Sequence, residues 1–85
     1  MRRDVLRYYF DVDDGRLSTV DDEGMELANP EHARREALAF LGALAKDALP
    51  AGTREITINV RNGTGAHHIF ELRLAVEMKE IGSDA

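Results

Sequence analysis

Residues 27–52 read LANPEHARREALAFLGALAKDALPAG, and this stretch decides the fold because it is the one clearly helical segment between strand-like ones. Asn29 can accept hydrogen bonds from the free amides of a helix start, Pro30 suits the first helical position, and Glu31 complements the positive end of the helix dipole. Pro50 stops the helix after about five turns. The sequence therefore predicts a single long helix.

The predicted helix has one apolar side. At about 100° per residue, one broad arc contains Ala33, Ala37, Phe40, Leu41, Leu44, Ala45, Ala48 and Leu49. We expect the rest of the chain to cover this arc. Arg34 also falls within it, and we expect its methylene groups to lie on the core edge while its guanidinium pairs with Glu26 or with an acidic turn.

The segments on either side of the helix alternate apolar and polar residues. This period of two is typical of strands with one buried face. Strands are predicted at residues 6–12, 16–20, 56–60 and 70–78, and a short further strand at 25–27.

Turn residues set the predicted strand registers. Asp14-Gly15 is a dipeptide that favours a two-residue hairpin loop, which would place Val12 opposite Leu17.

The second predicted hairpin has a three-residue loop, 63–65, with Gly65 in the left-handed conformation. This register places Val60 opposite His68 and Ile58 opposite Phe70. By alternation His68 then points toward the rim of the core.

These elements predict one α+β domain over residues 1–85, with a frayed tail at 80–85. The order is strand, strand, short strand, helix, strand, strand. An antiparallel sheet of four strands, or five if residues 25–27 also pair, carries the helix on one face.

The length and the apolar content of the strands suggest an order within the sheet. Segments 70–78 and 6–12 form the two most apolar strands, so we expect them side by side at the centre. Segments 16–20 and 56–60 are then expected at the edges.

Composition excludes several classes of function. The 85 residues contain no cysteine, which removes disulfides, thiolate metal sites and cysteine nucleophiles. A net charge of −5 with dispersed basic residues disfavours nucleic-acid binding. Neither a signal peptide nor a run of eighteen apolar residues is visible, so we expect a cytoplasmic protein without membrane contact.

The acidic stretch 11–24, DVDDGRLSTVDDEG, invites comparison with a calcium loop. Counted from Asp11, Gly15 stands at the fifth position, where an EF-hand needs an oxygen ligand. We therefore predict turns with solvated charge and no metal site. The weak metal candidates are Asp13, Asp14, Asp21, Asp22 and Glu23, in case both turns share a cation.

No other pattern indicates catalysis. The three histidines, His32, His67 and His68, are not placed to converge on a zinc ion. No serine stands in a recognisable relation to a histidine and a carboxylate, and GTG at 63–65 lacks the rest of a phosphate-binding loop. We expect no catalytic residue and no cofactor, hence not an enzyme.

Two surfaces are candidates for interaction, although both have the composition of ordinary solvent surface. The outer side of the helix carries the small residues Ala39, Gly42 and Ala43, and the open sheet face carries Tyr9, Ile69 and Arg73. Strand 56–60 offers a third route to a homodimer, because it has no proline or evident bulge that would block edge pairing.

The blocks RYYFDVDDG (7–15), DDEGMEL (21–27) and HARREALAFLGALAKDALP (32–50), followed by two alternating strands, resemble a known family. It is a family of small, uncharacterised bacterial domains of unknown function that is common in alphaproteobacteria. The resemblance implies a compact α+β protein and supplies no activity, ligand or catalytic residue. A looser likeness, at fold level, is to HicB-type antitoxins, with PEHARREA (30–37) in place of their helix start.

The leading interpretation is a non-enzymatic accessory or protein-interaction domain, with an unknown protein or a second copy of itself as partner. One alternative is an antitoxin-like regulatory module that binds a toxin or RNA. Another is a small metal-dependent enzyme that uses the acidic turns.

Overall fold

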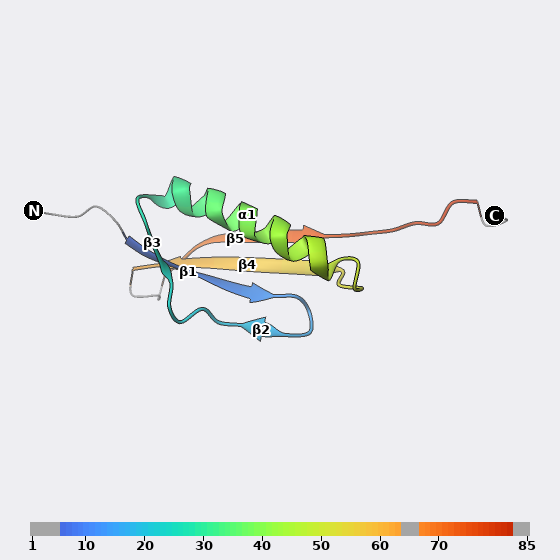
Figure 1. The fold of residues 1–85 in the computed structure, drawn as a ribbon, viewed down its shortest axis with the longest axis horizontal. Coiled ribbons are helices and arrows are strands. Elements are labelled where there is room, and N and C mark those ends of the chain that lie inside the picture. Colours follow the sequence, from blue (N-terminus) through green and yellow to red (C-terminus); the bar gives the residue numbers. More distant parts are fainter. Residues whose placement is uncertain (1–5, 64–66, 83–85) are drawn as a thin grey trace, which may run out of the picture.

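The computed structural model describes residues 6–63 and 67–82 and has one helix lying on an antiparallel sheet (Figure 1). The elements are β1 (Leu6–Asp13), β2 (Ser18–Thr19), β3 (Met25–Leu27), α1 (Pro30–Ala48), β4 (Glu55–Asn62) and β5 (His67–Ala75). The predicted α+β class and the order of elements along the chain are confirmed, and the short segment 25–27 does pair in the sheet.

The order of strands within the sheet differs from the prediction. It is β2-β1-β4-β5, with β3 also paired to β1, so β4 is central and β5 lies at an edge. The expected pairing of β1 with β5 is therefore wrong. The apolar residues of β4 are fewer but fully buried, with Ile58 and Val60 at 0% exposure, whereas those of β5 are only half-buried. Burial under the helix, rather than the length of the apolar run, marks the central strand.

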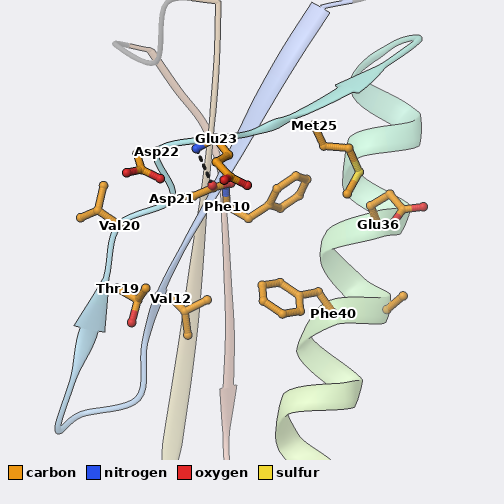
Figure 2. A pocket seen from close by; sticks show the side chains of 11 residues that line it. Phe10, Val12, Thr19, Val20, Asp21, Asp22, Glu23, Met25, Glu36 and Phe40 are labelled. Atoms are coloured by element: carbon orange, nitrogen blue, oxygen red, sulfur yellow. Dashed lines mark hydrogen bonds between the residues drawn. The ribbon is translucent and has the colours of Figure 1, made fainter.

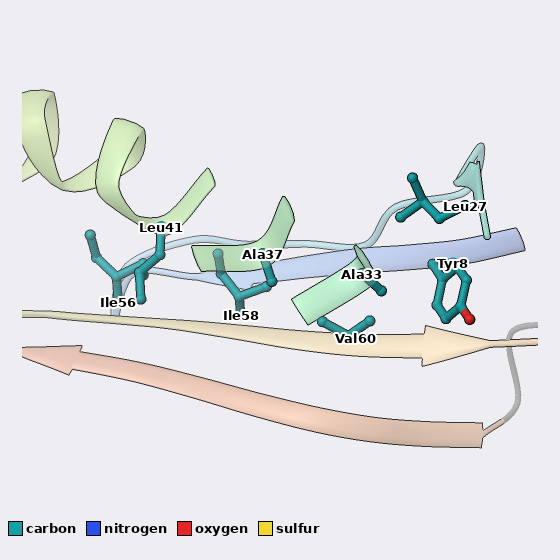
Figure 3. Close-up of a cluster of buried hydrophobic side chains, with 8 residues drawn as sticks. All are labelled: Tyr8, Leu27, Ala33, Ala37, Leu41, Ile56, Ile58 and Val60. Carbon is teal, nitrogen blue, oxygen red and sulfur yellow. The ribbon is translucent and has the colours of Figure 1, made fainter. Parts of the chain in front are cut away.

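The core lies between α1 and the facing side of the sheet (Figure 3). Its buried members are Tyr8, Leu27, Ala33, Ala37, Leu41, Ile56, Ile58 and Val60. Small alanines on the helix allow it to lie close to the β-branched residues of β4. The predicted helix start is confirmed, because the Asn29 side chain accepts a hydrogen bond from the His32 amide at 2.8 Å. In the described residues, no helix has the length and apolarity needed to cross a membrane.

The first hairpin has a longer loop than predicted. Val12 lies opposite Thr19 rather than Leu17, so the loop is 14–17. The Asp14 carboxylate accepts from the amides of Arg16 at 3.0 Å and of Leu17 at 2.9 Å, which satisfies the turn without a tight two-residue loop. The register shifts by two residues, so each side chain keeps its predicted face.

The second hairpin also has a different register. Val60 pairs with Phe70 and Arg61 with His68, so Ile69 is an extra residue in a β-bulge. His68 is exposed and lies beside Arg61, on the sheet face away from α1, so its predicted position at the core rim is wrong. The bulge reverses the alternation that the prediction relied on. The predicted left-handed Gly65 lies outside the described residues.

Candidate functional site

An ion pair on the outer sheet face connects the two central strands. Arg61 donates from Nε to Asp11 Oδ2 at 2.7 Å and from Nη2 to Asp11 Oδ1 at 2.8 Å. The two side chains expose only 14% and 20% of their surface, and the guanidinium carbon lies 4.9 Å from the centre of the Tyr9 ring. The hydrogen bonds from Arg61 lower the pKa of the Asp11 carboxyl. This bidentate, partly buried pair holds β1 and β4 in register.

Asp21 bridges a gap in the pairing of β1. On one side, β1 pairs with β3 at residues 6–8 and with β2 at residues 12–13, which leaves a gap between them. In this gap the Asp21 carboxylate accepts a hydrogen bond from the Phe10 amide at 3.0 Å, as Figure 2 shows. It also accepts from the amides of Glu23 and Gly24, both at 3.0 Å. Desolvation acts to raise the pKa of Asp21, but these three amides outweigh it and the pKa is lowered. The side chain thus supplies an acceptor that a neighbouring strand would otherwise provide.

The loop that carries Asp21 is tied to the outer-face ion pair. The Asp21 amide donates to Asp11 Oδ1 at 2.9 Å, and Arg61 Nη2 donates to the Asp21 carbonyl at 2.9 Å. Gly24 has φ +74°, and a Cβ there would lie 2.8 Å from Arg7 Cγ and 2.9 Å from Tyr9 Cε2. Both its conformation and its close approach to the sheet require glycine.

The other acidic turn is satisfied within itself. Asp13 accepts from the Gly15 amide at 2.7 Å and from Ser18 Oγ at 2.9 Å. The amides of Arg16 and Leu17 lower the pKa of Asp14. Within residues 6–63 and 67–82, no three histidine, aspartate or glutamate side chains form a group that could hold a metal ion. The carboxylates of the two turns are therefore not gathered into one cluster.

An apolar groove lies between α1 and the chain that runs from β2 to β3 (Figure 2). It has a volume of about 660 Å³ and is lined by Phe10, Val12, Thr19, Val20, Asp21, Asp22, Glu23, Met25, Glu36, Ala39 and Phe40. The Phe10 and Phe40 side chains project into it from opposite walls. Val20 is 70% exposed and Phe40 39% exposed, so the groove is open to solvent.

The groove follows from covering a wide sheet with one helix. Strands lie about 4.8 Å apart and a helix packs at about 10 Å, so one helix covers roughly two strands. Here α1 contacts β4, β5 and β3. The helix covers Tyr8 at the start of β1, which is buried, but leaves β2 and the end of β1 beside it only partly covered. The α1 residues that face this side are Glu36, Ala39 and Phe40.

Sequence reasoning placed Phe40 in the buried arc and did not identify the groove. A signal was available, because four or five strands are wider than a single helix can cover. What was missing was the strand order, which decides the side that stays open.

The predicted interaction residues occupy separate places. Ala39 lines the groove, whereas Gly42 and Ala43 are exposed on α1. Tyr9 stacks on Arg61 on the outer face, and Ile69 packs against the core cluster. The structure does not bring them into one patch.

Three exposed arginines form ion pairs, and Arg34 has a partner other than the one expected. Arg34 pairs with Glu31 at 2.8 Å, so its predicted pairing with Glu26 or an acidic turn is wrong. Arg7 instead contacts Glu26 at 3.4 Å. Arg73 pairs with Glu71 at 2.7 Å on the exposed side of β5.

A model of a domain of unknown function, DUF6894, matches residues 7–75, from β1 through β5. The chain belongs to the DUF6894 family. No curated protein and no solved structure matches it. The predicted membership in an uncharacterised domain family is confirmed.

Proposed function

We propose that this DUF6894 domain is a non-enzymatic, cytoplasmic protein-interaction module that binds a segment of a partner protein in the groove beside α1. The observation that carries the proposal is the open apolar lining, with Phe10, Phe40 and Val20 around one hollow of about 660 Å³. Apolar surface that gathers in a concave site gains free energy when a partner side chain removes it from water, by about 25 cal/mol per Å². Such a site favours binding over chemistry.

The charge at the groove indicates the partner's composition. Asp22, Glu23 and Glu36 line it together with the apolar residues. The Asp21 carboxylate is already occupied by backbone amides, so Asp22 and Glu23 remain to face a ligand. Glu36 also faces the groove and has His32 Nε2 at 3.7 Å from its carboxylate. We therefore expect a partner segment with at least two apolar side chains flanked by lysine or arginine. The net charge of −5 would also steer such a segment toward the domain.

The proposal is tested by fluorescence anisotropy with a labelled peptide in which phenylalanine and leucine alternate with lysine. A second peptide, with glutamate in place of lysine, tests the charge of the groove. We expect the lysine peptide to bind at least about tenfold more tightly, and more weakly as salt is raised. Equal affinity for the two peptides would contradict the proposal.

Two helix variants locate the binding. Phe40→Glu puts a charge into the groove, and Leu38→Glu makes the same change on a residue of similar exposure, 48% against 39%, on the other side of α1. We expect Phe40→Glu to weaken binding of the lysine peptide by about tenfold or more and Leu38→Glu to leave it within about twofold. Equal losses in both variants would place the peptide elsewhere.

The antitoxin-like alternative is a special case of this proposal, because a small basic toxin would suit an acidic groove. An RNA ligand does not suit it, since Asp22, Glu23 and Glu36 would repel phosphates. A gene for a small basic protein adjacent to that of this domain would favour the toxin as partner.

A further inference from the structure

The edge of the sheet farthest from the groove is formed by β5. The sheet order is β2-β1-β4-β5, so one side of β5 is paired with β4 and the other has no strand beside it among the described residues. This edge contains no proline, and its regular part, residues 70–75, follows the bulge at Ile69. The predicted homodimer route through strand 56–60 is excluded, because β4 lies inside the sheet. The edge of β5 takes its place.

The backbone groups available at this edge follow from the ladder with β4. The Val76 amide donates to the Arg54 carbonyl at 2.9 Å, across the sheet. Because the direction of N–H and C=O alternates along a strand, the backbone groups of Leu74 and Leu72 also point to β4. Those of Glu71 and Arg73 point out of the sheet. A second strand can therefore pair with β5 through Glu71 and Arg73 without disturbing the fold.

The side chains of β5 form a self-complementary pattern. Residues 70–74 read Phe-Glu-Leu-Arg-Leu, with the apolar residues on the face that packs on the core and the charged pair on the outer face. If a second copy pairs antiparallel about a two-fold axis at Leu72, Glu71 lies opposite Arg73 of the other copy, and Arg73 lies opposite Glu71 of the other copy. A shift by two residues in either direction places Glu71 opposite itself or Arg73 opposite itself. Charge therefore selects one register.

The helix side of the same edge is also apolar. Leu38 is 48% exposed and lies about 160° around α1 from Phe40, which faces the groove, so it lies toward β5. Phe70, Leu72 and Leu74 are half-buried against the core beneath it. In the paired arrangement Phe70 meets Leu74 of the second copy, and Leu38 approaches its equivalent. Edge pairing would thus cover apolar surface as well as backbone groups.

We propose that two copies of this chain associate edge to edge through β5, centred on Leu72, so that their sheets become one continuous sheet with both helices on the same face. The occupant of the β5 edge is thus a second copy, argued from the opposite charges of Glu71 and Arg73 and from the apolar surface beside them. The groove beside α1 lies at the β2 side of the sheet, opposite to β5, and stays open in the dimer.

Sedimentation equilibrium of the full chain tests this proposal. The chain has a mass of 9.5 kDa. We expect its concentration to be raised to no more than about 500 µM before a dimer of twice that mass forms. Arg73→Glu and Glu71→Arg each place like charges opposite one another, and each should weaken the dimer by about tenfold. The double variant restores opposite charges and should return the dissociation constant to within about threefold of wild type. Both residues are exposed, so the domain should stay folded in all three variants.

Lys46→Glu is the matched control, since it reverses the charge of an exposed residue on the side of α1 opposite to the buried Ala37 and should leave the dimer unchanged. A chain that stays monomeric throughout this concentration range would overturn the proposal. A dimer whose dissociation constant in both single charge variants equals that of the wild-type chain would overturn it as well. Peptide binding in the groove is read separately through Phe40→Glu, so either proposal can fail without the other.

Discussion

Asp21 shows how one side chain can take the place of part of a strand. Its carboxylate accepts hydrogen bonds from three backbone amides, those of Phe10, Glu23 and Gly24. Phe10 lies in the interval where β1 has no strand partner on that side. The neighbouring Asp22 makes no such bonds and lies at the groove instead. From the sequence the two aspartates were equivalent members of an acidic turn, because nothing in the order of residues says which carboxylate reaches a buried amide.

Replacing these two aspartates separates the roles. Asp21→Ala leaves partly buried amides without an acceptor, and we expect it to lower the free energy of unfolding by about 1–3 kcal/mol. Asp22→Ala should change it by less than about 0.5 kcal/mol, since its side chain is exposed. Urea denaturation followed by circular dichroism measures both. Equal losses of unfolding free energy in the two variants would show that the Asp21 carboxylate does not hold the loop against β1.

At the scale of elements, the prediction from sequence succeeded where local chemistry decides. The cap at Asn29 and the proline at position 30 placed the helix start correctly, and alternation placed the strands. It failed where contacts between distant segments decide. The position of β4 beneath the helix and the bulge at Ile69 depend on packing that no local pattern encodes.

Two turn glycines, one between β1 and β2 and one between β2 and β3, differ in their surroundings. Gly15 and Gly24 both have positive φ, +89° and +74°, but a Cβ at Gly15 meets nothing within 4 Å while one at Gly24 meets Arg7 and Tyr9. Gly15→Ala should therefore cost about 1 kcal/mol of stability, and Gly24→Ala clearly more, about 2–4 kcal/mol. Thermal unfolding of the two variants gives the comparison. If Gly15→Ala were the more damaging change, the loop could not lie against the sheet as described.

At the scale of the whole molecule, the sheet is wider than the helix that covers it. This mismatch was implicit in the predicted number of strands, but the exposed side depends on the strand order. The same mismatch leaves the groove at one side of the sheet and the apolar edge with Leu38 and β5 at the other. Both proposed contacts are therefore consequences of one helix on a broad sheet.

Stability should depend on pH through the carboxylates that hold the sheet and loop together. The pKa values of Asp11 and Asp21 are both lowered, so the folded state favours their ionised forms. Their contribution is present above the unfolded pKa, about 4, and is lost as the pH falls through the lowered folded values. We expect the free energy of unfolding to be level from pH 7 to about pH 5 and then to fall with acidification. In Asp11→Asn this fall should be shallower, and a stability that rose below pH 4 would contradict the assignment.

The central claim is that the groove beside α1 binds an apolar segment flanked by basic residues. The most direct measurement is a series of ¹H–¹⁵N correlation spectra of the labelled domain during addition of the lysine peptide. The account predicts saturable shift changes at Phe10, Val20, Met25 and Phe40, with Glu71 and Arg73 at the far edge unmoved. Shifts confined to the outer sheet face or to the β5 edge, or no shifts at a millimolar excess of peptide, would contradict it.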